Sequence, residues 1–214
     1  MHGEVIERRK PPRAAAPVLA VLTVVVGAWI ALRVTGEGWY LQGVRQAGNG
    51  QIEPARASFR SALQIHPVHA GALHALAELD PSGPLAGKRL QAAERLRPAW
   101  IPPVITRFDR ALLADDAEDL RTTLEKAKRL DPHGLETRLI EVRKCLHEKR
   151  WGEATSLLSG IARIWPQHVD VWFARVRLAE GRGRIDEAKR LLRDMLRRHP
   201  HLLHAQAWLR RIDR

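Results

Sequence analysis

The stretch 166-PQHVDVWFARVRLAEGRGRIDEAKRLLRDMLRRHP-200 decides the fold of this chain of 214 residues. A proline stands at each end, and the sequence Gly-Arg-Gly at 181–183 separates two segments with helix-like spacing of apolar residues. Prolines recur towards the N-terminus at nearly constant spacing, and the series is Pro67, Pro98, Pro132, Pro166 and Pro200. A fixed period in the mid-thirties is typical of a solenoid of stacked helical units.

The residues before each proline repeat in register. The fifth unit contains Trp172, Val176, Gly183, Ile185, Ala188, Leu192 and Met195, and the first contains Trp39, Gly43, Ala55, Phe59 and Ala62. This pattern resembles the tetratricopeptide repeat across nearly all of residues 36–200. The resemblance implies an all-α solenoid of about five helix pairs over residues 36–200, closed by a C-terminal capping helix over residues 201–214.

Small residues are expected where the two helices of a pair cross. The first, second, fourth and fifth units have alanine there, at Ala55, Ala86, Ala154 and Ala188, whereas the third has Leu120. An apolar residue follows three to four positions later in each second helix, so that each helix carries an apolar stripe. The second unit fits least well, because its turn around residues 81–84 is about three residues short.

An uncharged segment precedes the repeats. The nineteen residues from Ala14 to Leu32 carry no charge. As a helix they would span roughly 28 Å at ~1.5 Å per residue, close to the ~30 Å hydrocarbon core of a bilayer. We predict a basic cytoplasmic tail over residues 1–13 and a transmembrane helix over residues 14–34 that contacts the lipid bilayer.

The flanking charges predict the orientation of this helix. Arg8, Arg9, Lys10 and Arg13 precede the segment and only Arg33 directly follows it, so the N-terminus should be cytoplasmic. The composition, with arginine favoured over lysine, suggests a bacterium; the repeats would then be periplasmic and the anchor would lie in the inner membrane. A cleaved signal peptide and a buried soluble helix are the alternatives.

The formal net charge of +12 restricts the partners. Residues 1–33 account for +3 of it, and the repeats carry the rest. Such a balance favours anionic surfaces, whether lipid headgroups, nucleic acid or acidic protein. A periplasmic location argues against nucleic acid, so other proteins are the expected partners.

The sequence has no motif for catalysis. It contains no glycine-rich phosphate loop, nucleophile elbow or HExxH sequence, and its one cysteine, Cys145, is expected in the core. The histidines cluster near the repeat prolines, where exposed turns explain them better than a metal site does. We therefore expect no enzyme activity, catalytic residue, cofactor, metal or small-molecule substrate.

Two surfaces are candidates for partner binding. In the resembled family the first helix of each pair lines the concave groove, which here would contain Tyr40, Leu139, Arg143, Phe173 and Arg177; arginines there could bind carboxylates of an acidic peptide. A second basic surface runs along the last full second helix, with Lys189, Arg190, Arg193, Arg197 and Arg198. Solvated arginines on a basic protein are the alternative explanation for both.

These features together predict a membrane-anchored periplasmic scaffold or assembly factor that docks proteins of an envelope or membrane complex. A permanent structural subunit of a larger membrane complex is the main alternative. A nucleic-acid-binding protein is a further alternative, which would require the repeats to be cytoplasmic.

Overall fold

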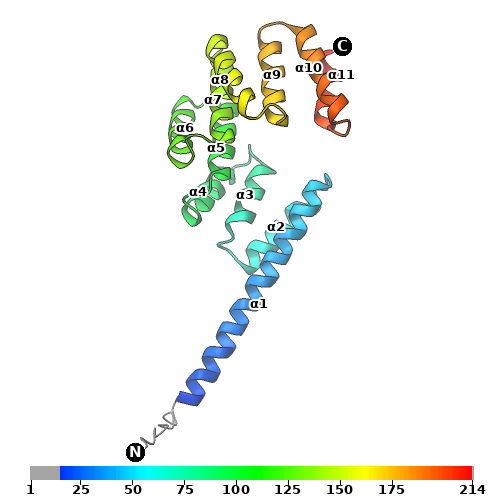
Figure 1. Cartoon of the computed structure of the whole chain (residues 1–214). Helices are drawn as coiled ribbons and strands as arrows, with labels where there is room; N and C mark the ends of the chain where they lie inside the picture. The colour runs from blue at the N-terminus through cyan, green and yellow to red at the C-terminus, as the bar shows by residue number, and fades with distance from the viewer. Residues whose placement is uncertain (1–14, 214) are drawn as a thin grey trace, which may run out of the picture. The chain divides into compact units, whose positions relative to one another are not determined.

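The computed structural model describes residues 15–213, with side chains from residue 21 onward. The predicted cytoplasmic tail of residues 1–13 lies outside the described residues, as does Arg214. Residues 15–213 form helices joined by short turns and contain no strand. The prediction of an all-α chain is therefore confirmed over this range (Figure 1).

The chain divides into two compact units, Met1–Leu79 and Asp80–Arg214. The first contains α1 (Ala15–Gly48), α2 (Ile52–Ile65) and α3 (Ala70–Glu78). The helices of the second are α4 (Ala86–Leu96), α5 (Pro102–Ala114), α6 (Ala117–Leu130), α7 (Leu135–His147), α8 (Trp151–Ile164), α9 (Val169–Gly181), α10 (Ile185–Arg198) and α11 (Leu203–Ile212). The division falls inside the second predicted helix pair, the one whose sequence fits the repeat least well.

Helix α1 joins the apolar segment to the first repeat without a break. It runs from Ala15 to Gly48 and so passes residue 35, where the predicted transmembrane segment and the predicted solenoid meet. The apolar side chains from Val21 to Val34 are exposed; Val24, for example, is 71 % exposed. Among the described residues, one helical segment, Val21–Gly48, is long and apolar enough to cross a membrane.

The C-terminal half of α1 packs against α2 and α3. Gly43 lets the helices approach closely, since a Cβ there would lie 2.6 Å from the ring of Phe59. The core of this unit consists of Ala55, Phe59, Ala62, Ala72 and Leu76, with Tyr40 packed against it. The apolar stripe of α2 is thus buried by the same helix that carries the exposed apolar segment.

The second unit repeats one packing arrangement along the chain. Helices α5 and α6, α7 and α8, and α9 and α10 form successive pairs, and α11 packs against α10. Helix α7 also contacts α5 and α9, so the first helices of neighbouring pairs lie side by side. Figure 1 shows α11 as the last helix of this series, next to α10 and at the C-terminus.

The predicted crossing residues are buried. Ala55, Ala86, Ala154 and Ala188 have no exposed surface, and Leu120 is 3 % exposed. Leu120 belongs to a core with Val104, Phe108 and Ile140, so the larger side chain is accommodated in the third unit.

The repeat prolines end the second helices as expected. The residue before each proline has left the helical region, with φ from −150° to −124° and ψ from 63° to 82°; these residues are His66, Arg97, Asp131, Trp165 and His199. A proline ring disfavours the helical conformation of the preceding residue. The amide of each such residue still donates to the carbonyl four residues earlier, so the last helical turn is complete.

The turn within a pair has one left-handed residue in four of the five predicted pairs, and the described turn between α3 and α4 has none. Asp115, Lys149 and Gly183 stand at equivalent positions of successive pairs and have φ of 55°, 56° and 73°, and Gly50 has φ of 75° in the first pair. Glycine adopts this conformation without a steric cost, whereas residues with a Cβ do so at a cost of ~1–2 kcal/mol. The period thus extends to the backbone conformation of the turns.

Gly183→Ala should lower the free energy of unfolding by about 1 kcal/mol, because the added Cβ disfavours the left-handed backbone. Gly160→Ala is the control. Gly160 lies inside α8 with open space beside it, so alanine should raise stability by about 0.5–1 kcal/mol. Thermal melting of the full chain in mild detergent, followed by circular dichroism, measures both; ~1 kcal/mol corresponds to about 2–4 °C. Melting of Gly183→Ala at or above the wild-type temperature would contradict the turn assignment.

Candidate functional site

A groove on the first helices of the second unit is the candidate partner site. Its volume is about 460 Å³, and side chains of α5, α7, α9 and α11 line it. These helices occupy equivalent places in successive units, so the repeat period brings equivalent positions into one surface. We call this site the α5–α11 groove; its lining includes Asp109, Leu112, Leu113, Leu139, Arg143, Leu146, Asp170, Phe173, Arg177, His204 and Trp208.

One charged position recurs in all four helices. Asp109, Arg143, Arg177 and Arg211 follow one another at the repeat spacing. Arg143 Nη1 donates to both carboxylate oxygens of Asp109, at 2.7 and 3.0 Å. Arg211 Nη2 donates to Glu180 at 2.7 Å. The cations on either side of Arg177 therefore have acidic partners.

Arg177 itself makes no ion pair with any residue that the structure describes. Its guanidinium lies over the ring of Trp208, 5.8 Å from the ring centre, which is a weaker interaction than pairing with a carboxylate. Burial lowers the pKa of Arg177, and the neighbouring positive charge of Arg143 lowers it further. The carboxylates of Asp109 and Glu180 oppose this shift. Arg177 is also exposed to solvent, so its charge is accessible to an anion that enters the groove.

The apolar part of the groove is an aromatic platform. The rings of Phe173 and Trp208 stack at a centroid distance of 5.9 Å and an interplanar angle of 9°. His204 meets the ring of Phe173 edge-on at 5.2 Å. Leu113 stands beside this platform and is 71 % exposed. The groove therefore combines one uncompensated cation with apolar surface, a combination suited to an extended peptide segment with an acidic group.

The structure brings together some of the predicted groove residues. Leu139, Arg143, Phe173 and Arg177 all line the α5–α11 groove. Tyr40 lies in the first unit, where its ring packs against Phe59 at 5.8 Å and His69 at 4.7 Å. Its contacts there are those of a residue packed against the core.

Sequence reasoning missed Asp109, Arg211 and Trp208. The first two could have been found by extending the Arg143–Arg177 spacing by one period in each direction. Trp208 is largely buried against the core of α9 and α10. Its indole also donates to Glu180 at 3.1 Å and contributes to the groove. The capping helix α11 therefore supplies part of the candidate site.

The predicted basic surface of α10 is partly neutralised. Lys189 and Arg193 lie 2.9 and 3.6 Å from the carboxylate of Asp213, and Arg197 pairs with Asp194. Arg190 is exposed and has no acidic partner within residues 21–213. This surface offers less free positive charge than the run of basic residues suggests.

Cys145 lies in the core, and the histidines of the described part of the chain lie apart from it. Cys145 is buried in the core of α7, α8 and α9, and burial raises the pKa of its thiol, which keeps the thiol protonated at neutral pH. In the part of the chain that the structure describes, no three histidine, cysteine or carboxylate side chains converge as metal ligands would.

Arg177→Gln should leave the free energy of unfolding within about 0.5 kcal/mol of wild type, because the arginine contributes no ion pair and faces like charges. Arg143→Gln should lower it by up to about 1 kcal/mol, because it removes the partly exposed pair with Asp109. Thermal melting of the two variants side by side tests this order, and a larger loss in Arg177→Gln would show that Arg177 is a structural residue.

The comparisons with known proteins agree with this architecture. Residues 146–212 match the family model of the tetratricopeptide repeat. A solved tetratricopeptide repeat protein from Thermus thermophilus superposes with a TM-score of 0.70 at 19 % identity, covering 83 % of this chain and 98 % of that one. A second, from Parabacteroides merdae, gives a TM-score of 0.51 at 14 % identity and covers 83 % and 72 %. No curated protein sequence matches the chain.

Proposed function

We propose that this chain is a membrane-anchored periplasmic scaffold or assembly factor. Residues 146–212 match the tetratricopeptide repeat, and the stacked helix pairs have the fold of protein–protein interaction scaffolds. In this proposal α1 holds the chain in the bacterial inner membrane, and the α5–α11 groove docks a segment of another protein of an envelope or membrane complex. The observation that carries the docking role is Arg177, an arginine without an acidic partner among the described side chains, in a groove that the exposed Leu113 and the half-buried Phe173 also line.

The geometry of the groove favours an extended segment with a carboxylate. A guanidinium can bind a carboxylate through two parallel hydrogen bonds, and Arg177 has its donors available for this. Arg143 and Arg211 already donate hydrogen bonds to Asp109 and Glu180. Among the described residues of this row, Arg177 is therefore the arginine that can bind an anion from a partner. Apolar side chains of the segment would cover Leu113 and the Phe173–Trp208 platform. One carboxylate with flanking apolar residues is therefore the motif that fits.

The anchor supports the proposal through effective concentration. Confinement to a bilayer raises the encounter rate with other membrane proteins without any new contact. Helix α1 continues from the apolar segment directly into the first helix pair, so no flexible linker separates the two. The exposed apolar side chains along Val21–Val34 are those that lipid would cover.

Arg177→Glu should reduce capture of the docked protein at least tenfold, because it removes a charge-assisted hydrogen bond and adds like-charge repulsion. The measurement is quantitative affinity purification of the full chain from membranes in mild detergent. Arg163→Glu is the matched control, since Arg163 is exposed on α8 and lies outside the groove. Equal capture by both variants would remove the groove from the proposal.

The same purification separates a scaffold from a permanent subunit. A transiently docked partner should dissociate as salt rises, because a single exposed ion pair is screened. Partners that stay bound in stoichiometric amounts at high salt would instead favour a permanent structural subunit. Such a subunit would be held in its complex by packing of α1 against other membrane helices.

A reporter that is active only in the periplasm, fused after Arg214, should be active if α1 is an anchor with a cytoplasmic N-terminus. The intact mass of the membrane-extracted chain should also equal that of all 214 residues, about 24.2 kDa apart from modification of the N-terminal methionine. A shorter chain released without detergent would indicate a cleaved signal peptide. An inactive reporter would place the repeats in the cytoplasm and reopen the nucleic-acid alternative.

A further inference from the structure

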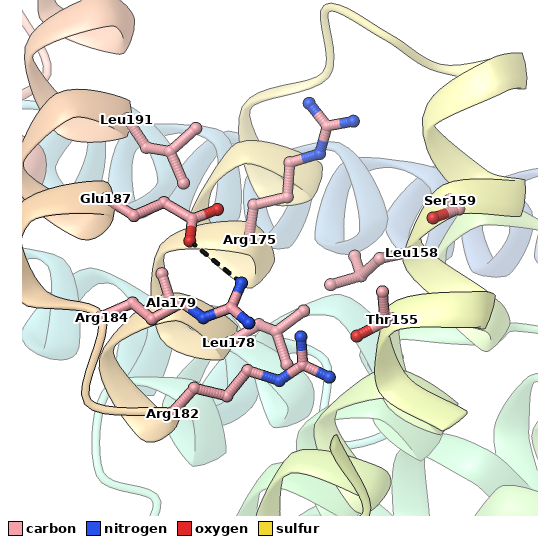
Figure 2. Close-up of a pocket in the computed structure, with 10 residues that line it drawn as sticks. All are labelled: Thr155, Leu158, Ser159, Arg175, Leu178, Ala179, Arg182, Arg184, Glu187 and Leu191. Carbon is pink, nitrogen blue, oxygen red and sulfur yellow. Dashed lines mark ion pairs between the residues drawn. The ribbon is translucent and has the colours of Figure 1, made fainter. Parts of the chain in front are cut away.

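A second pocket lies between the second helices of the last two pairs. Helices α8, α9 and α10 enclose about 320 Å³, and Figure 2 shows the side chains that line it. We call it the α8–α10 pocket and define it by Leu158, Arg175, Leu178, Arg182, Arg184 and Leu191. None of these six residues lines the α5–α11 groove.

Helix α9 serves both sites with different faces. Phe173 and Arg177 are one helical turn apart and line the groove, whereas Arg175, Leu178 and Arg182 follow the helical spacing on another face and line the pocket. The groove and the pocket can therefore be altered independently of one another by substitutions on the same helix.

The pocket has an apolar floor. Leu158 is 2 % exposed, and Leu178 and Ala179 are also buried. Leu191 is half-buried and contributes from α10. Only small parts of Leu158 and Leu178 remain accessible, so a single apolar side chain placed on them and on Leu191 would complete their burial.

Three arginines surround this floor, and one glutamate opposes them. Arg184 lies 3.5 Å from Glu187, as the dashed line in Figure 2 marks. Arg182 Nη2 donates to the backbone carbonyl of Trp151 at 2.9 Å, a bond that leaves its charge without a carboxylate. Arg175 has no hydrogen bond or ion pair to any residue from 21 to 213. In Figure 2 the guanidinium of Arg175 points away from Glu187.

The combination of surplus positive charge and leucine side chains indicates which kind of ligand the pocket can bind. A free phosphate or sulfate would use the arginines and leave the apolar floor uncovered. A purely apolar group would leave the arginines uncompensated. We propose that the α8–α10 pocket binds a partner-protein segment in which an acidic side chain adjoins an apolar one, with the carboxylate between the guanidinium groups and the apolar side chain on Leu158, Leu178 and Leu191. The net positive charge of the whole chain agrees with such a partner.

Nuclear magnetic resonance of the full chain in zwitterionic nanodiscs tests this directly. The probe is the peptide acetyl-Glu-Leu-Glu-amide, observed through leucine methyl groups and arginine Nε–H groups. The methyl groups of Leu158, Leu178 and Leu191 should shift together with the Arg175 and Arg184 side chains. The double variant Arg175→Gln with Arg184→Gln should raise the Kd at least tenfold, and Arg163→Gln should leave it unchanged.

Three controls decide against other occupants. At equal concentration, the peptide acetyl-Gln-Leu-Gln-amide should change the chemical shifts of the pocket residues at least tenfold less than acetyl-Glu-Leu-Glu-amide does. Equal chemical-shift changes with the two peptides would overturn the proposal. Inorganic phosphate that moves the arginine signals as strongly as the peptide would reveal a simple anion site instead. Shifts of the same residues in nanodiscs containing anionic lipid, without peptide, would assign the pocket to lipid headgroups. Absence of any chemical-shift change with acetyl-Glu-Leu-Glu-amide would also overturn the proposal.

The test is independent of the docking role of the groove. Chemical-shift changes of the Leu113 and Leu139 methyl groups report the α5–α11 groove, and those of the Leu158 and Leu191 methyl groups report the α8–α10 pocket. Loss of one set through Arg177→Glu and of the other through the Arg175 and Arg184 substitutions would show two separate sites on α9. Loss of both sets in either variant would contradict the separation and the proposal with it.

Discussion

The close crossing of the two helices in each pair constrains the rest of the molecule. The second helix of a pair has one apolar stripe, and it can bury this stripe only if the backbones approach each other. A small residue at the crossing permits this, and Ala154 and Ala188 are fully buried there. In the first pair α1 supplies Gly43 from the opposite side, against the ring of Phe59. Neighbouring pairs then cover the surface that a single pair leaves exposed.

This constraint also brings the residues of the candidate sites together. Because each helix pair repeats the packing of the pair before it, equivalent positions of successive first helices lie in one row. A charged residue at such a position can therefore recur once in every pair. Asp109, Arg143, Arg177 and Arg211 form such a row. Two of the three arginines are compensated by carboxylates, and the third is left over an indole ring. A regular fold thus produces an irregular distribution of charge, and that irregularity is what a partner could recognise.

Much of the architecture could be predicted because its causes are local. A proline affects the residue directly before it, and all five residues before the repeat prolines have left the helical region. The spacing of apolar residues within one helix predicts which face of that helix is buried, as Leu158 and Leu192 confirm. The second pair was the weakest in sequence, and the chain divides into its two units there. The continuity of α1 was not predicted, since Gly36 and Gly38 are poor helix formers at the point where the two predicted segments meet. In the structure Gly36 lies against α2, and the helix continues through both glycines.

The candidate sites were predictable only in part. The resemblance to the tetratricopeptide repeat predicted Arg143 and Arg177 on one surface, and extending their spacing by one period would have added Arg211 to the same row. It could not assign Asp213 to Lys189 and Arg193, or distinguish the groove face of α9 from the face that lines the α8–α10 pocket.

The helical period, the turn positions and the apolar stripe of each helix follow from the amino-acid sequence, because these features depend on residues a few positions apart. Which arginines keep a free charge depends on how the helices pack. That outcome depends on carboxylates that are distant in the sequence, as for Lys189 with Asp213 and Arg143 with Asp109, and such groups meet only when the helices stack.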